Sequence, residues 1–192
     1  MPFARHQPTV MVRLPGGQSR LRQMILYVST KCESARYFGA IKLNKIIWKA
    51  DFDSFLETGL PITGREYRKQ KFGPALREMV PVRREMLQDG AIRIEQREFG
   101  EGIIEERTIP LDRPDLSLFT SRDVFYVDRS ISHYWEMTGM ESSDQSHGVA
   151  WLTRAIGDPI PYEASILSDS RPSDSQFARL TRLIRGRELM TQ

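Results

Sequence analysis

One stretch of the sequence, from about Gly39 to Thr58, has the pattern of a helix with apolar residues on two sides. It is followed by Gly59 and Pro61, which are common signals of a helix end. One apolar face contains Leu43, Ile46, Ile47 and Ala50. The other contains Ile41, Trp48, Phe52 and Phe55, and a narrow basic stripe between the faces contains Lys42, Lys45 and Lys49.

A helix that is apolar on two sides is typical of the centre of a domain. We therefore expect residues 39–58 to form the middle of the core. The alternative is that one of the two faces docks a partner, which the sequence leaves open.

The rest of the chain predicts a mainly α, α+β fold: a compact helical domain with a small β-hairpin. Helical periodicity is present at 19–32, 76–89 and 123–138, and more briefly within 142–157. Residues 91–109 alternate around a glycine-containing turn, as in a hairpin. Extended structure is expected at 62–72 and at 158–162, and Gly73-Pro74 is expected to break the chain.

A chain of 192 residues is long enough for one sizeable core. We expect an irregular N-terminal arm at 1–18, a helical domain at 19–167, and a polar linker with a basic C-terminal helix at 168–192. The amphipathic pattern of that last helix, over 176–190, is more typical of a docking element than of a membrane anchor.

Several classes of protein do not fit this composition. No run of 18 apolar residues occurs, and the first residues have no apolar secretory core, so we expect a cytoplasmic protein with no membrane contact. Cys32 is the single cysteine, and the histidines are few and scattered, so no disulfide, metal site or cofactor is expected. His133 and His147 lack a neighbouring nucleophile and orienting group, and we expect no enzymatic activity.

Charge is unevenly distributed along the chain. The first 50 residues contain nine basic residues and one acidic residue, whereas residues 101–150 contain four basic and ten acidic residues. The basic part is suited to nucleic acid or to an acidic protein, or it is simply a solvated face.

The order helix, helix, hairpin over 41–109 is also that of a winged helix, which makes a DNA-binding transcriptional regulator an alternative. The candidate recognition helix, however, has as many acidic as basic residues, and the candidate wing has three arginines against five glutamates. A DNA-facing surface would need an excess of Lys and Arg, so nucleic acid is not the favoured partner.

Six short motifs occur together in a fixed order. They are KLNKIIWKAD at 42–51, TGLPI at 58–62, KFGP at 71–74, SH at 146–147, AW at 150–151 and GDPIPYE at 157–163. Over roughly residues 20–167, the chain resembles the Panacea domain of SocA-like antitoxins, which is also seen in phage-associated proteins.

The resemblance implies a mainly helical fold with a small β-element. It also implies an antitoxin that neutralises a cognate protein toxin, expected to be encoded next to it, by direct contact. One member of the family is linked to proteolytic degradation of its toxin as an adaptor, so that role is a further alternative, and a homo-oligomer stays open. The family pattern carries over to Leu43, Lys45, Asp51, Phe72, Gly73, Pro74, His147, Trp151, Pro161 and Tyr162, either as contact or as fold-keeping positions.

We predict that partner contacts come from the central helix and from the basic extended segment that follows it. The candidate partner-binding residues are Lys45, Trp48, Phe52, Arg65, Arg68 and Phe72.

Overall fold

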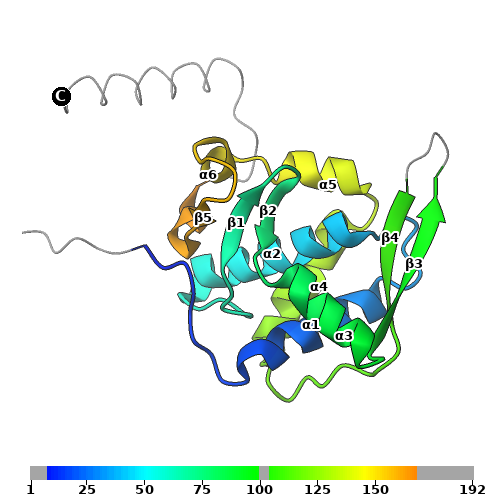
Figure 1. Cartoon of the computed structure of the whole chain (residues 1–192). Helices are drawn as coiled ribbons and strands as arrows, with labels where there is room; N and C mark the ends of the chain where they lie inside the picture. Colours follow the sequence, from blue (N-terminus) through cyan, green and yellow to red (C-terminus); the bar gives the residue numbers. More distant parts are fainter. Residues whose placement is uncertain (1–7, 100–103, 168–192) are drawn as a thin grey trace, which may run out of the picture.

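The computed structural model describes residues 8–99 and 104–167 (Figure 1). The helices are α1 (Gly17–Lys31), α2 (Ala40–Thr58), α3 (Met79–Gln88), α4 (Ser121–Tyr134), α5 (Gly139–Gln145), α6 (Val149–Leu152) and the 3-10 helix η1 (Tyr162–Ile166). The strands are β1 (Tyr67–Gln70), β2 (Gly73–Leu76), β3 (Ile92–Glu98), β4 (Ile104–Pro110) and β5 (Pro159–Ile160). The predicted mainly helical α+β class is confirmed.

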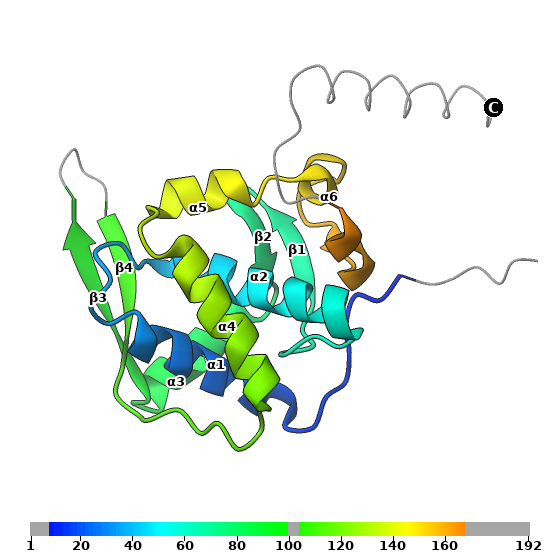
Figure 2. The same ribbon diagram turned by 180° about the vertical axis from the view of Figure 1, so that it is seen from behind.

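Helix α2 lies at the centre of the domain. It packs against α1, α4, α5, β2 and η1, and Figure 2 shows α4 crossing it on the side away from the sheet. Residues of both apolar faces are buried, including Leu43, Ile46, Trp48 and Phe52. The helix ends as predicted at Gly59, which adopts a left-handed conformation with φ 76°.

Most of the basic stripe predicted on α2 is buried. Lys42 and Lys45 are both about 1 % exposed, and their ammonium groups meet backbone carbonyls instead of solvent. Lys42 Nζ donates to the carbonyl oxygens of Tyr37 (2.7 Å) and Trp135 (2.6 Å). Only Lys49 keeps partial exposure, in an ion pair with Asp53 of the next turn. The periodicity places these lysines correctly on the helix, but their burial is set by the chain segments that cover them.

Two separate antiparallel sheets flank the helices (Figure 1). One has the strand order β2-β1-β5, with Tyr67 opposite Leu76 on one side and opposite Ile160 on the other. The other is the predicted hairpin, β3 with β4. The turn at its tip falls mostly at 100–103, outside the described residues.

The β1-β2 hairpin is a correction to the sequence-based expectation. Gly73-Pro74 was expected only to break the chain, but these residues begin β2. Because β2 is an edge strand, the missing amide hydrogen of Pro74 removes no interior ladder bond. The following helix accordingly begins at Met79, three residues later than expected.

The later elements are shorter than the periodicity suggests. Helix α4 begins with a capping box formed by Thr120 and Asp123, and ends at Tyr134 instead of about 138. The stretch 142–157 contains the end of α5 and all of α6, with Gly148 between them. The proline-rich segment after it is extended over Pro159–Pro161 and supplies β5, but Tyr162, also expected to be extended, begins η1.

Residues 8–16 of the predicted N-terminal arm are irregular but docked, whereas Gly17 and Gln18 already belong to α1. The amide of Tyr162 donates to the Thr9 carbonyl (2.8 Å), and the amide of Val12 donates to the Gly64 carbonyl (2.9 Å). The predicted linker and basic helix at 168–192 lie outside the described residues. In the described part of the chain, no helix has both the length and the apolar content needed to cross a bilayer.

Candidate partner-binding site

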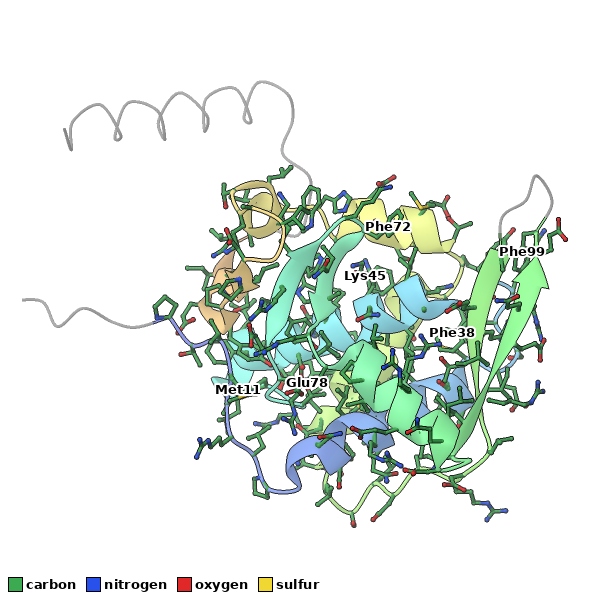
Figure 3. The ribbon with its side chains drawn as sticks, viewed as in Figure 1. Met11, Phe38, Lys45, Phe72, Glu78 and Phe99 are labelled. Atoms are coloured by element: carbon green, nitrogen blue, oxygen red, sulfur yellow. The ribbon has the colours of Figure 1, made fainter. Side chains whose placement is uncertain are left out.

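The family-motif residues gather where α2 faces the β1-β2 hairpin, α5, α6 and η1. Figure 3 shows Phe72 at the turn of this hairpin, beside α5, with Lys45 on α2 close to it. The motifs are far apart in the sequence, but the fold brings them to one side of the domain.

Lys45 and Gly73 form the tightest point of this region. Lys45 Nζ donates to the Pro74 carbonyl oxygen (2.7 Å). Gly73 has φ +93°, and a Cβ built on it would lie 2.1 Å from Ser146 Oγ and 2.6 Å from Lys45 Nζ. Only glycine tolerates both this backbone conformation and this crowding. Gly73 is therefore a fold-keeping position that lets α2, β2 and α5 converge.

The Lys45 ammonium has no carboxylate beside it among the described residues: the Pro74 carbonyl is the acceptor that it reaches. Because burial removes the water that would solvate the charge, the pKa of Lys45 falls from 10.5 to about 7. An anionic group brought close to this lysine would favour its charged form.

Asp51, six residues further along α2, has a fully satisfied carboxylate. Oδ1 accepts the amides of Ile62 (2.8 Å) and Thr63 (2.7 Å), and Oδ2 accepts the hydroxyls of Thr63 and Tyr67. Burial raises the pKa of this carboxyl, while the four hydrogen bonds act in the opposite direction. The carboxylate fastens the segment after α2 and leaves no lone pair for a partner, and Asp53 points elsewhere, toward Arg129.

Tyr162 completes the inner wall of the region. Its ring contacts those of Phe52, Phe55 and Tyr67 at centroid distances of 5.2, 5.3 and 6.1 Å. Its hydroxyl donates to the Arg65 carbonyl oxygen (2.7 Å), so the polar end is satisfied. Pro161 supplies the extended residue before η1. Both positions are therefore explained by the fold.

Trp151 and His147 lie nearer the surface. The two rings stack at 3.8 Å with an interplanar angle of 14°, and Lys69 Nζ lies 4.1 Å from the indole centroid. Trp151 Nε1 donates to the Gln70 carbonyl oxygen (2.9 Å). This arrangement ties α6 to the end of β1 and presents a basic and aromatic surface beside the hairpin turn.

The six candidate partner-binding residues separate into buried and accessible ones. Lys45, Trp48 and Phe52 are buried and offer no surface to a partner as the chain stands. Arg65 is largely covered and pairs with Glu78 (3.3 Å), and Arg68 pairs with Glu66 (2.7 Å).

Phe72 is the accessible aromatic residue of the set, at 39 % exposure. The neighbouring Lys71 is also exposed, and its Nζ lies 5.3 Å from the Phe72 ring centroid. Lys69 and Lys71 belong to the basic extended segment predicted from the sequence but were not selected as candidates, because their contacts with Trp151 and Phe72 become visible only in the fold. We call the surface formed by Lys69, Gln70, Lys71, Phe72, His147 and Trp151 the turn face.

A small, partly open pocket lies behind the turn face. Its volume is about 10 Å³, which is about enough for one water molecule. Trp48 and Phe52 of α2, Pro74 of β2, Trp151 of α6 and Leu167 are among its lining residues, and Ser146 contributes from the end of α5. The indole Nε1 of Trp48 is buried and has no hydrogen-bond acceptor in the described structure.

His133 and His147, the two histidines among the described residues, each contact polar side chains. Ser143 Oγ lies 3.4 Å from His147 Nε2, and Asp144 Oδ1 lies 3.9 Å from Nδ1, but the Ser143 hydroxyl belongs to a buried residue. His133 contacts Gln145. Within residues 8–99 and 104–167, no group of three or more His, Cys, Asp or Glu side chains is placed to hold a metal ion.

The hairpin that would serve as a DNA-binding wing has its described arginines already engaged. Arg93 and Arg97 both pair with Glu95, and Arg107 is buried, donating to the carbonyl oxygens of Cys32, Glu33 and Ala35. Arg107 therefore holds the fold together, whereas Arg93 and Arg97 are exposed but share their charge with Glu95, which weakens the hairpin as a phosphate-binding surface.

Comparison with known families agrees with the motif resemblance. Residues 43–152 match the family model described as antitoxin SocA-like, Panacea domain, which is more than half of the 192-residue chain. No curated protein and no solved structure was found to match. The matched segment runs from the start of the α2 core through the turn face to α6, so the chain belongs to the SocA-like antitoxin family and carries its Panacea domain.

Proposed function

We propose that this protein is a cytoplasmic antitoxin that neutralises a cognate protein toxin by binding it, without catalysis. Membership of the SocA-like antitoxin family supports a protein partner. We assign the binding to the turn face because an exposed phenylalanine lies there beside basic side chains.

The turn face has the composition of a binding surface. Phe72 offers an apolar side chain that a partner can cover, and such aromatic residues commonly contribute most of the binding energy at an interface. Lys71 lies beside Phe72 and Lys69 lies over the Trp151 ring, so the turn face carries positive charge. We therefore infer a toxin surface that is apolar at its centre and acidic at its rim, because complementary charge accelerates association and excludes wrong partners.

The turn face is also rigidly supported from behind. Lys69 Nζ donates to the Arg154 carbonyl oxygen (2.7 Å), and Trp151 holds the end of β1 through Gln70. The turn thus keeps its shape before binding, which lowers the ordering cost of association.

The direct test is co-expression with the protein encoded next to it, with growth and copurification as readouts. Rescue of growth together with a stable complex is the expected result. Unrelieved toxicity and no complex would refute the proposal for that pair.

Two substitutions place the interface on the turn face. Phe72→Ser and Lys71→Glu are expected to weaken binding by about tenfold or more each, since they remove an interface anchor and reverse a rim charge. Phe125→Ser and Arg84→Glu are matched controls, because Phe125 is exposed on α4 and Arg84 is exposed on α3. Equal affinities for the turn-face variants and the controls would place the interface elsewhere.

A further inference from the structure

Strand β3 has a backbone edge that no other described element pairs with. It is the outermost strand of the β3-β4 hairpin in both ribbon views (Figures 1 and 2). The amide of Leu111 donates to the Ala91 carbonyl oxygen (2.9 Å), so this carbonyl faces β4. Because backbone groups alternate in direction along an antiparallel strand, those of Ile94, Gln96 and Glu98 face away from β4. Within the described residues, no hydrogen bond from another element reaches these outward groups.

The edges of the other sheet are closed by side chains of the same chain. On β2, the Pro74 carbonyl oxygen accepts the Lys45 ammonium (2.7 Å). On β5, the Pro159 carbonyl oxygen accepts Arg154 Nε (3.1 Å). Strand β3 lacks such a cover, and it also contains neither a proline nor a bulge, which commonly protect an edge strand from pairing. Its open edge is therefore able to accept a further strand.

The charges along β3 suit pairing with a second copy of the same strand. Arg93, Glu95 and Arg97 lie on one face of the strand, where the Glu95 carboxylate pairs with both arginines (3.1 and 2.7 Å). When two copies run antiparallel with Gln96 opposite Gln96, each Glu95 lies directly opposite the Arg97 of the other copy. Opposite charges in such cross-strand pairs stabilise a sheet, and like charges destabilise it.

The direction of the backbone groups agrees with this register. The amide and carbonyl of Gln96 face outward, so the two copies can exchange a pair of backbone hydrogen bonds at this position. A pairing centred on Glu95 would oppose two carboxylates and would use backbone groups that face β4. A pairing centred on Ile94 would need the edge at Ala91 and Ile92, and both residues are buried.

We propose that this protein forms a symmetric dimer in which two β3 strands pair antiparallel around Gln96. The two hairpins then become one four-stranded sheet, which is more stable than a two-stranded hairpin that stands alone. None of the residues that pair belongs to the turn face, so this surface is separate from the proposed toxin-binding surface. Its tests need no toxin, and their result does not depend on the proposed function.

Sedimentation equilibrium of the full-length chain measures the association. We expect a species with twice the mass of one chain, which dissociates on dilution. A wild-type protein that stays monomeric at about 100 μM overturns the proposal.

Proline substitution tests which edge pairs. Gln96→Pro removes an outward amide that the β3-β4 ladder does not use, and an edge strand tolerates proline at such a position. We expect it to raise the dissociation constant of the dimer by about tenfold or more. Glu106→Pro is the matched control, because Glu106 is exposed, lies opposite Gln96 on β4 and has its amide directed away from β3. Undiminished dimerisation of Gln96→Pro overturns the proposal.

Exchange of two charges tests the register and decides the question if the proline variants fail to fold. Glu95→Lys alone and Arg97→Glu alone each bring two pairs of like charges together in the symmetric dimer, so each should weaken association by about tenfold or more. An equimolar mixture of the two variants should recover dimerisation. In that mixed dimer the introduced lysine lies opposite the introduced glutamate, and the native Arg97 lies opposite the native Glu95. A mixture that associates no better than its components overturns the proposal, as does full association of either variant alone.

Discussion

Lys45, which is buried on α2, makes the stability of this protein depend on pH in a predictable direction. In the unfolded chain Lys45 titrates near its ordinary pKa of 10.5, and in the folded chain burial lowers this pKa to about 7. Between these values the unfolded chain holds a proton that the folded chain has lost. Stability therefore rises with pH over this range, and at lower pH the folded state carries the cost of a buried charge.

The size of the effect follows from the shift. Each pKa unit corresponds to about 1.4 kcal/mol, so the contribution of Lys45 should change by about 2 kcal/mol between about pH 7 and about pH 9. Replacing Lys45 by Met removes this titration. It also removes the hydrogen bond to the Pro74 carbonyl, at a cost of about 1 kcal/mol that does not vary with pH.

Urea denaturation at a series of pH values measures the difference. The free energy of unfolding of the wild type should increase relative to that of Lys45→Met as the pH rises. Lys71→Met removes an exposed lysine, so its difference from the wild type should stay constant with pH. A constant gap between wild type and Lys45→Met from about pH 6 to about pH 9 would refute a buried, uncompensated ammonium.

Three further predictions concern buried residues that hold the domain and its candidate site in place. Gly73→Ala should cost about 2–4 kcal/mol of stability in urea denaturation, because the new Cβ meets Ser146 and Lys45 and φ is +93°. Gly59→Ala, with φ +76° and open space, should cost only about 1 kcal/mol. Tyr67→Phe should cost about 1.5–3 kcal/mol by removing a bond to the buried Asp51 carboxylate, and Tyr126→Phe, whose partner Glu57 is exposed, should cost less; equal losses would contradict the role given to Asp51. Cys32, whose pKa burial raises to about 12, should resist thiol-specific labelling in the native protein and react once the chain is unfolded, so rapid native labelling would show that the end of α1 is open.

The sequence pattern was sufficient where local rules decide the structure. The two apolar faces of 39–58, the Gly59 end and the extended proline-rich segment all follow from periodicity and from the conformational limits of Gly and Pro. The motif resemblance likewise identified the family over the segment that the family model matches.

The site itself depends on contacts that local rules do not encode. The sequence predicts Lys42 and Lys45 only as part of a basic stripe between two apolar faces, because a lysine is almost always exposed and periodicity does not indicate its burial. The carbonyl oxygens of Tyr37, Trp135 and Pro74 make this burial tolerable. Gly73-Pro74 reads as a break because both residues are poor strand formers, and only the edge position of β2 admits them.

Tertiary contacts also decide which of the candidate partner-binding residues are exposed. Trp48 and Phe52 lie on the helix face that the sheet and η1 cover, so they belong to the core. Phe72 lies in the hairpin turn and is exposed. Ser146, which lies within the quoted SH motif, was not singled out because its contact with the Gly73 position depends on how α5 approaches β2.

Hydrogen–deuterium exchange of this protein, alone and in complex with the protein encoded next to it, tests the central claim most directly. Binding through the turn face predicts slower exchange at residues 69–73 and 146–152, with unchanged exchange in the β3-β4 hairpin. Protection confined to β3-β4 or to α3, with none at the β1-β2 turn, would contradict the account.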